Sequence, residues 1–184
     1  MTMVRGRDFG AIAPGIISAA MVLTACLAAC DSSPEGRSPQ GQVTQVIDGN
    51  TLEVQRLDRP GAIPEKVRLL GIDAPKLDQD PWGPASHSVL GQWLGGQEVR
   101  LEFSNPPRDR YNRLLAYVWQ GDRLINEALV QDGLAVVSEQ ANGSPYEQKL
   151  RHAQGEARTL QRGIWNPAQP MRTAPAQFRQ NSAP

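Results

Sequence analysis

Alternation of apolar and polar residues marks five short segments in the middle of the chain as β-strands. These segments are residues 42–47, 51–55, 66–72, 98–103 and 114–119. A period of two indicates a strand with one face against a core. The first two segments flank Asp48-Gly49-Asn50, a tight-turn sequence in which glycine and asparagine both tolerate positive φ. These two strands are therefore expected to form a hairpin.

Three further segments show the longer repeat of an amphipathic helix. The first lies between the third and fourth strands and ends at Gly95-Gly96, and the second covers about residues 124–132. The third begins with the sequence SPYE at residues 144–147, which offers an N-cap serine, a first-turn proline and a capping-box glutamate. Five short strands with interleaved and trailing helices predict an α+β, mostly β domain, a five-stranded OB-fold barrel with about three helices.

The same pattern separates a folded domain from its polar flanks. Residues 42–166 hold all four tryptophans and every periodic segment. Residues 30–41 are short, polar and rich in serine, proline and glycine, which indicates a flexible tether. Residues 167–184 hold four prolines and no apolar periodicity, so they are expected to form a disordered C-terminal tail.

Residues 1–29 have the order of a secretory signal peptide. Arg5 and Arg7 give a positive start, an uncharged stretch follows, and the sequence LAAC ends at Cys30. This last sequence resembles the bacterial lipoprotein processing box, which implies cleavage before Cys30 and lipid attachment to that cysteine. Cys26 is a second candidate for the processing site.

An uncleaved anchor is the alternative for this segment, because about 20 apolar residues would just span a bilayer. Both interpretations place the domain outside the cytoplasm. We expect a membrane-anchored lipoprotein of the cell envelope, held through an N-terminal lipid anchor, or a secreted protein, in either case as a monomer.

The chain has no net charge, because 19 Lys and Arg residues balance 19 Asp and Glu residues. Electrostatic attraction of the whole molecule to nucleic acid is therefore excluded. Affinity for phosphate has to come from local clusters. One cluster is RLLGIDAPK at residues 68–76, where a strand that carries Arg68 ends in Asp73 and the chain turns at Pro75. The guanidinium group of Arg68 and the carboxylate of Asp73 are therefore expected to lie at the same rim of the predicted barrel.

Four motifs in order resemble the staphylococcal nuclease (thermonuclease-like) domain family. They are VIDGNT at 46–51, RLLGIDAP at 68–75, DRYNR at 109–113 followed by LLAYV, and NEALV at 126–130 leading to GLA. The resemblance covers residues 43–166. It implies an OB barrel that cleaves DNA and RNA phosphodiesters with one Ca²⁺ ion, two phosphate-binding arginines, and a glutamate that orients or activates the attacking water.

By this resemblance, Arg68 and Arg113 are the two catalytic arginines. Their planar groups can grip phosphate oxygens and neutralise charge as the bond breaks. Tyr111 is a substrate-binding residue that can donate a hydrogen bond to the phosphate, with plain packing on a loop as its alternative. Asp73 matches a metal ligand. For Arg68 the alternative is a surface ion pair.

Two positions depart from the family's acidic pattern. Asn50 stands where a second aspartate ligand is usual, and Lys76 stands in place of the glutamate. Together the two changes make the site three charge units more positive, so calcium binding is expected to be weak or lost. Lys76 becomes a candidate substrate-binding residue, and Asp48 and Asp78 are the nearby spare carboxylates.

The sequence therefore predicts an extracytoplasmic nuclease-like domain that binds nucleic-acid phosphodiesters. If it is an enzyme, it is a phosphodiester hydrolase of the calcium-dependent nuclease type, attenuated by Asn50 and Lys76. The alternative is a catalytically inactive module, tethered to the membrane, that binds DNA, RNA or another polyanion.

Overall fold

The computed structural model describes residues 38–181, which fall within one compact unit, Gly36–Pro184. The predicted signal peptide and the predicted lipid attachment at Cys30 lie outside the described residues. None of the helices within residues 38–181 combines the length and the apolar character needed to cross a bilayer.

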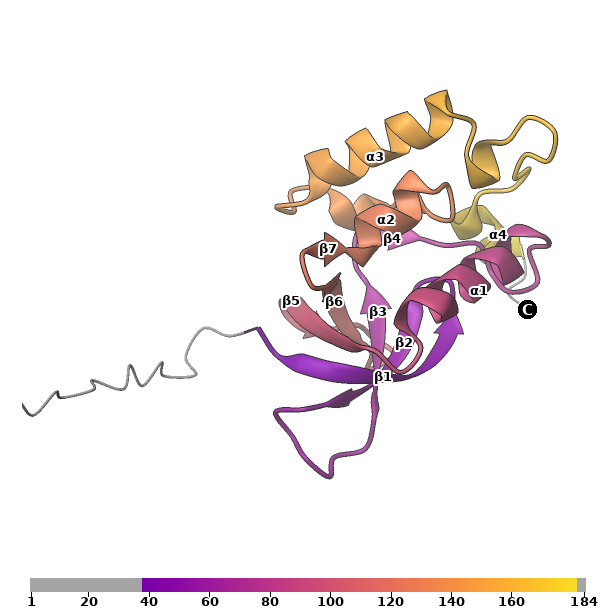
Figure 1. The fold of residues 1–184 in the computed structure, drawn as a ribbon. Coiled ribbons are helices and arrows are strands. Elements are labelled where there is room, and N and C mark those ends of the chain that lie inside the picture. The colour runs from indigo at the N-terminus through magenta and orange to yellow at the C-terminus, as the bar shows by residue number, and fades with distance from the viewer. Residues whose placement is uncertain (1–37, 182–184) are drawn as a thin grey trace, which may run out of the picture. The chain divides into compact units, whose positions relative to one another are not determined.

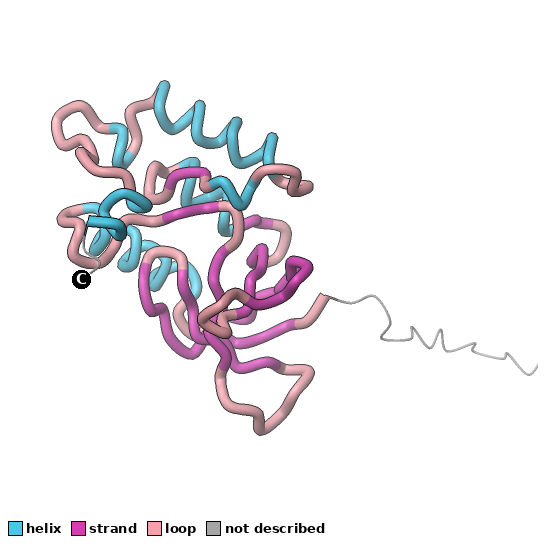
Figure 2. The backbone as a smooth tube through the Cα atoms, turned by 180° about the vertical axis from the view of Figure 1, so that it is seen from behind, coloured by secondary structure: helices cyan, strands magenta, loops and turns pink. Residues whose placement is uncertain are grey.

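Five strands close into a barrel (Figures 1 and 2). They are β1 (Gln40–Asp48), β2 (Thr51–Arg56), β3 (Glu65–Leu69), β5 (Glu98–Arg108) and β6 (Leu114–Gln120). Antiparallel neighbours follow the order β3-β2-β1-β5-β6, and parallel pairing of β3 with β6 closes the ring. The short β7 (Arg123–Leu124) pairs with β6. The predicted five-stranded OB-type barrel is confirmed.

The barrel interior is filled by the apolar side of each strand. Val67 of β3 pairs with Leu52 of β2 on one side and with Leu114 of β6 on the other, and all three are buried. Full burial of such a side chain contributes about 1.5–3 kcal/mol. The alternation that predicted the strands is thus the pattern that forms this core.

Three helices pack outside the barrel. They are α1 (Trp82–Leu94), α2 (Ile125–Gln131) and α3 (Glu147–Thr159), and α2 lies between the barrel and α3 (Figure 1). The start of α3 differs from the predicted capping box. The Glu147 carboxylate accepts a hydrogen bond from the backbone N–H of Gly143 at 2.7 Å, and no side chain caps the helix.

A second, two-stranded sheet lies beside the barrel and carries Asp73. Its strands are β4 (Ile72–Asp73) and β8 (Val136–Val137), the latter followed by the 3₁₀ turn η1 (Glu139–Ala141). The buried side chain of Asn126 fixes this region to the barrel. It accepts a hydrogen bond from the Val118 N–H at 2.9 Å and donates one to the Leu70 carbonyl at 2.8 Å.

A disordered tail was predicted over residues 167–184, and residues 167–181 depart from that prediction. After the 3₁₀ turn η2 (Gly163–Trp165), the chain forms α4 (Pro175–Asn181). Side chains distant in sequence hold the segment. The indole N–H of Trp82 donates to the Gln169 carbonyl, and Gln79 Nε2 donates to the Thr173 carbonyl, each at 3.0 Å. These contacts are tertiary, so the local sequence pattern gave no sign of them.

Candidate functional site

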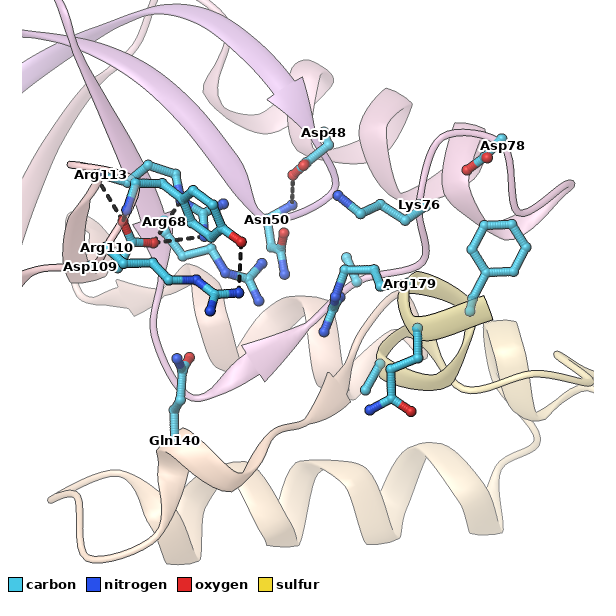
Figure 3. Close-up of a pocket in the computed structure, with 15 residues that line it drawn as sticks. Asp48, Asn50, Arg68, Lys76, Asp78, Asp109, Arg110, Arg113, Gln140 and Arg179 are labelled. Carbon is cyan, nitrogen blue, oxygen red and sulfur yellow. Dashed lines mark hydrogen bonds and ion pairs between the residues drawn. The ribbon is translucent and has the colours of Figure 1, made fainter. Parts of the chain in front are cut away.

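A cavity of about 1140 Å³ lies where the β1–β2 turn, β3, the β5–β6 loop, the loop after β4 and α4 meet (Figure 3). Five cationic side chains line it, against three carboxylates. The cations are Arg68, Lys76, Arg110, Arg113 and Arg179, and the carboxylates are Asp48, Asp78 and Asp109. This excess of positive charge suits an anionic ligand. The cavity also brings the predicted Tyr111 and Asn50 together with these arginines.

Arg68 projects from β3 and is largely buried, with 11% of its side chain exposed. Its Nη2 donates to the Ile72 carbonyl at 3.2 Å and to Asp73 Oδ1 at 3.1 Å. Burial lowers the pKa of Arg68, and the adjacent Asp73 opposes that shift. Arg68 is thus ion-paired, but within the wall of the cavity rather than on the open surface.

Arg113 is positioned by a compact loop built on Asp109. One carboxylate oxygen of Asp109 accepts the backbone N–H groups of Tyr111 at 2.9 Å and Arg113 at 3.0 Å, and the other accepts Arg113 Nε at 2.8 Å. Asn112 occupies the left-handed region at φ 61°, which asparagine tolerates. Burial alone would raise the pKa of Asp109, but the hydrogen bonds from Arg113 and Tyr111 bring it below its ordinary value.

The two predicted arginines influence each other across the cavity. The positive charge of Arg113 contributes to the lowered pKa of Arg68, whereas the charge of Asp48 acts in the opposite direction. The two guanidinium groups therefore share one electrostatic environment. A bound anion would relieve their repulsion.

Tyr111 lies at the mouth of the cavity, with 64% of its surface exposed. Its hydroxyl accepts a hydrogen bond from Arg110 Nη2 at 2.7 Å, and the Arg110 and Arg113 guanidinium groups lie 4.8 and 5.4 Å from the ring centre. The hydroxyl keeps its own hydrogen as a donor. Tyr111 is thus placed to reach a phosphate beside Arg113.

Asp73 is engaged by a partner that the sequence did not suggest. Arg179 of α4 forms a two-pronged ion pair with it, Nη1 to Oδ1 and Nη2 to Oδ2, each at 2.6 Å. Asp73 is only 3% exposed. Its hydrogen bond raises the pKa of Arg179. The two residues are 106 positions apart, and no motif in the sequence links them.

The residues present do not fit a calcium ion in this arrangement. Calcium takes about 6–8 oxygen ligands, with carboxylates supplying the charge. Both Asp73 oxygens already accept guanidinium N–H groups, and the Asn50 side chain is neutral and donates to the Ile72 carbonyl at 3.4 Å. Within residues 38–181, no three His, Cys, Asp or Glu side chains gather as a metal site would require. The metal roles predicted for Asp73 and Asn50 find no support in this geometry.

Lys76 stands where its charge can act on the cavity. Its backbone N–H donates to Gln79 Oε1 at 3.0 Å, which fixes the loop after β4, and its side chain points toward Asp48 and Asn50 (Figure 3). Asp48 accepts the backbone N–H of Asn50 at 3.0 Å. Asp78 is exposed and lies beyond Lys76, away from Arg68 and Arg113 (Figure 3).

Comparison with known proteins agrees with the four motifs. A family model described as staphylococcal nuclease homologue matches residues 66–167. A thermonuclease of Staphylococcus intermedius is 37% identical over 139 residues, which cover 73% of this chain and 80% of the relative. A thermonuclease of Staphylococcus hyicus is 34% identical over 130 residues (68% and 75%), and an uncharacterized endonuclease of Escherichia coli is 37% identical over 132 residues (71% and 80%). The chain belongs to the staphylococcal nuclease family.

Proposed function

We propose that this chain binds the phosphodiester backbone of DNA or RNA in the cavity and hydrolyses it slowly. The observation that carries the proposal is the convergence of Arg68 and Arg113 on one cationic cavity. Relatives named thermonuclease and endonuclease make nucleic acid the natural anion.

Both arginines keep donors for a phosphate despite their ion pairs. Arginine carries five N–H donors. The described contacts use two from Arg68, both on Nη2, and two from Arg113, on Nε and Nη2. The remaining groups can bind the non-bridging phosphate oxygens and neutralise charge as a P–O bond breaks. Tyr111 adds a donor at the mouth.

Proton removal from the attacking water is the step in which this site is weakest. A protonated Lys76 has no lone pair with which to accept a proton. Loss of a general base costs about 10²–10⁴-fold in rate. Asp48 and Asp78, which also line the cavity, are the carboxylates left for this role.

A non-catalytic binding module is the second candidate function. It is favoured by the engagement of both Asp73 oxygens with guanidinium groups. In that case the cavity holds nucleic acid or another polyanion through Lys76 and the arginines, without turnover.

Two measurements on the full-length chain separate these functions. Cleavage of a labelled DNA is followed in a gel with calcium, manganese and chelator side by side, and binding of a short fluorescent oligonucleotide is followed in chelator. We expect Arg68→Gln and Arg113→Gln each to weaken binding about 10-fold. Arg59→Gln, an exposed arginine on the β2–β3 loop, is the matched control and should leave binding unchanged. Equal affinities for all four proteins would refute the proposed site, and brisk calcium-dependent cleavage by the wild type would refute the attenuation.

We also propose that the domain is held outside the cytoplasm by a lipid on Cys30. The support is the sequence order of residues 1–30. Metabolic labelling with an alkyne-tagged fatty acid should mark the wild type and leave Cys30→Ser unlabelled. Persistent labelling of that variant would point to Cys26.

A further inference from the structure

The C-terminal helix α4 adds a third arginine to the cavity. Arg179 lines the cavity together with three other residues of the same segment, Ala176, Phe178 and Gln180. Figure 3 shows its side chain directed toward Arg68 and Asn50. The position is fixed at two levels, by the ion pair with Asp73 and by the anchoring of the segment before the helix.

A single carboxylate orients two guanidinium groups here. Asp73 accepts Arg68 Nη2 at 3.1 Å and both Arg179 Nη groups at 2.6 Å, and it is almost completely buried. The contacts to Asp73 use two of the N–H donors of Arg179, which leaves three for a ligand. The buried Asp73 carboxylate therefore holds two guanidinium groups in place. Their positive charge lies where a divalent cation bound to Asp73 would lie.

The two departures from the family's acidic pattern, Asn50 and Lys76, are consistent with a cationic site around Asp73. Asn50 brings no negative charge and Lys76 brings a positive one, and both line the cavity beside Arg179. Each change disfavours a bound metal cation and favours a bound anion. Arg179 supplies, from within the chain, a cation next to Asp73.

We propose that Arg179 is a third phosphate-binding residue, which takes the place of a metal ion beside Asp73 and lets the site bind a phosphodiester without any divalent ion. This inference rests on the proposed function of the cavity. Asp73 is then a positioning residue that aligns Arg68 and Arg179 rather than a metal ligand. Helix α4 is a functional part of the site.

The test compares full-length variants in the binding of a fluorescent oligothymidylate, in chelator and over a range of salt concentrations. We expect Arg179→Gln to lose about 10-fold in affinity. We also expect the slope of log affinity against log salt to fall by about 0.7, the value for one single-strand phosphate contact. Arg179→Lys should bind with intermediate affinity, because it keeps the charge and loses the planar fork. Arg172→Gln, an exposed arginine of the same segment that does not line the cavity, should bind as the wild type does, with the same salt slope.

The other outcomes overturn the inference in distinct ways. Tighter binding by Arg179→Gln would identify α4 as an inhibitory strap. Unchanged affinity and slope, with Arg68→Gln and Arg113→Gln still impaired, would remove Arg179 from the site and leave the proposed function intact. If none of the three cavity variants changed binding, the proposed function would fail as well. A circular dichroism melt of each variant verifies that a loss of affinity does not reflect unfolding.

Discussion

Asp109 shows how one residue builds half of the site. Its carboxylate accepts hydrogen bonds from two backbone N–H groups and from the Arg113 side chain, so one anion ties together the loop that presents Arg113 and Tyr111. The position of Asp109 in the DRYNR motif did not indicate this role. Its function is local order rather than contact with substrate.

Replacement of the Asp109 carboxylate should therefore reduce the stability of the fold only at pH values at which this carboxylate is ionised. The pKa of Asp109 lies below its ordinary value of 3.8 in the folded protein, so the ionised form stabilises the fold above that pH, and the contribution is lost as pH falls through the lowered pKa. We expect Asp109→Asn to reduce the free energy of unfolding by about 1 kcal/mol at pH 7. The difference from wild type should shrink as pH falls below 3.8 and through the lowered pKa of Asp109.

Urea denaturation at several pH values measures this difference. Asp122→Asn, an exposed aspartate in the β6–β7 turn, is the control and should show little change at any pH. A stability loss for Asp109→Asn that stayed constant as pH fell through the lowered pKa would contradict an electrostatic role for Asp109.

At the scale of elements, Asn126 joins α2 to the barrel and to the turn that leads into β4. Asn126→Ala would leave the buried Val118 N–H and Leu70 carbonyl without their partner. Each orphaned group costs about 1–3 kcal/mol, so we expect a loss of about 2–6 kcal/mol in the free energy of unfolding. Thermal and urea unfolding measure it.

Asn181→Ala, which removes an exposed asparagine at the end of α4, should change stability by less than about 0.5 kcal/mol. Oligonucleotide affinity of Asn126→Ala, measured well below its melting temperature, should stay close to wild type because Asn126 does not line the cavity. If Asn126→Ala were as stable as wild type, another group would have to satisfy the Val118 N–H and the Leu70 carbonyl.

Helix α4 decides whether a metal site can be rebuilt. Asn50→Asp with Lys76→Glu adds two carboxylates to the cavity, but Arg179 still occupies Asp73. We expect this double variant to bind calcium weakly by titration calorimetry, and the addition of Arg179→Gln to tighten binding at least about 10-fold, because Asp73 Oδ2 becomes free and Oδ1 keeps only its contact with Arg68.

Addition of Arg172→Gln to the double variant is the matched control and should leave its calcium affinity unchanged. Calcium-dependent DNA cleavage should rise in the same order as affinity, by about 10²–10⁴-fold over wild type where the restored glutamate acts as base. Equal calcium affinity with and without Arg179 would show that this residue does not compete with the metal.

At the scale of the whole molecule, the parts that follow local patterns were predictable from the sequence. The alternation of Val67, Leu69 and their partners fixed the strands, and four ordered motifs located Arg68 and Arg113 at the same cavity. The C-terminal segment was not predictable, because its order comes from contacts with Gln79 and Trp82, about 90 residues away. Arg179 was not predicted either, because it is 106 positions from its partner Asp73.

The whole chain carries no net charge, so its affinity for a polyanion depends on where charges lie. A cavity with three phosphate contacts should give a salt slope of about 2 for a single-stranded ligand, since each contact contributes about 0.7. Fluorescence anisotropy between low and moderate salt measures it. A slope near zero would mean that phosphate contacts do not drive binding.

A crystal structure of the full-length chain with a short oligothymidylate, grown in chelator, would show directly whether Arg68 and Arg113 bind phosphate together. We expect a phosphate group within hydrogen-bonding distance of the Arg68 and Arg113 guanidinium groups. A structure with these two groups facing an empty cavity, while the oligonucleotide lies on another surface, would contradict this expectation.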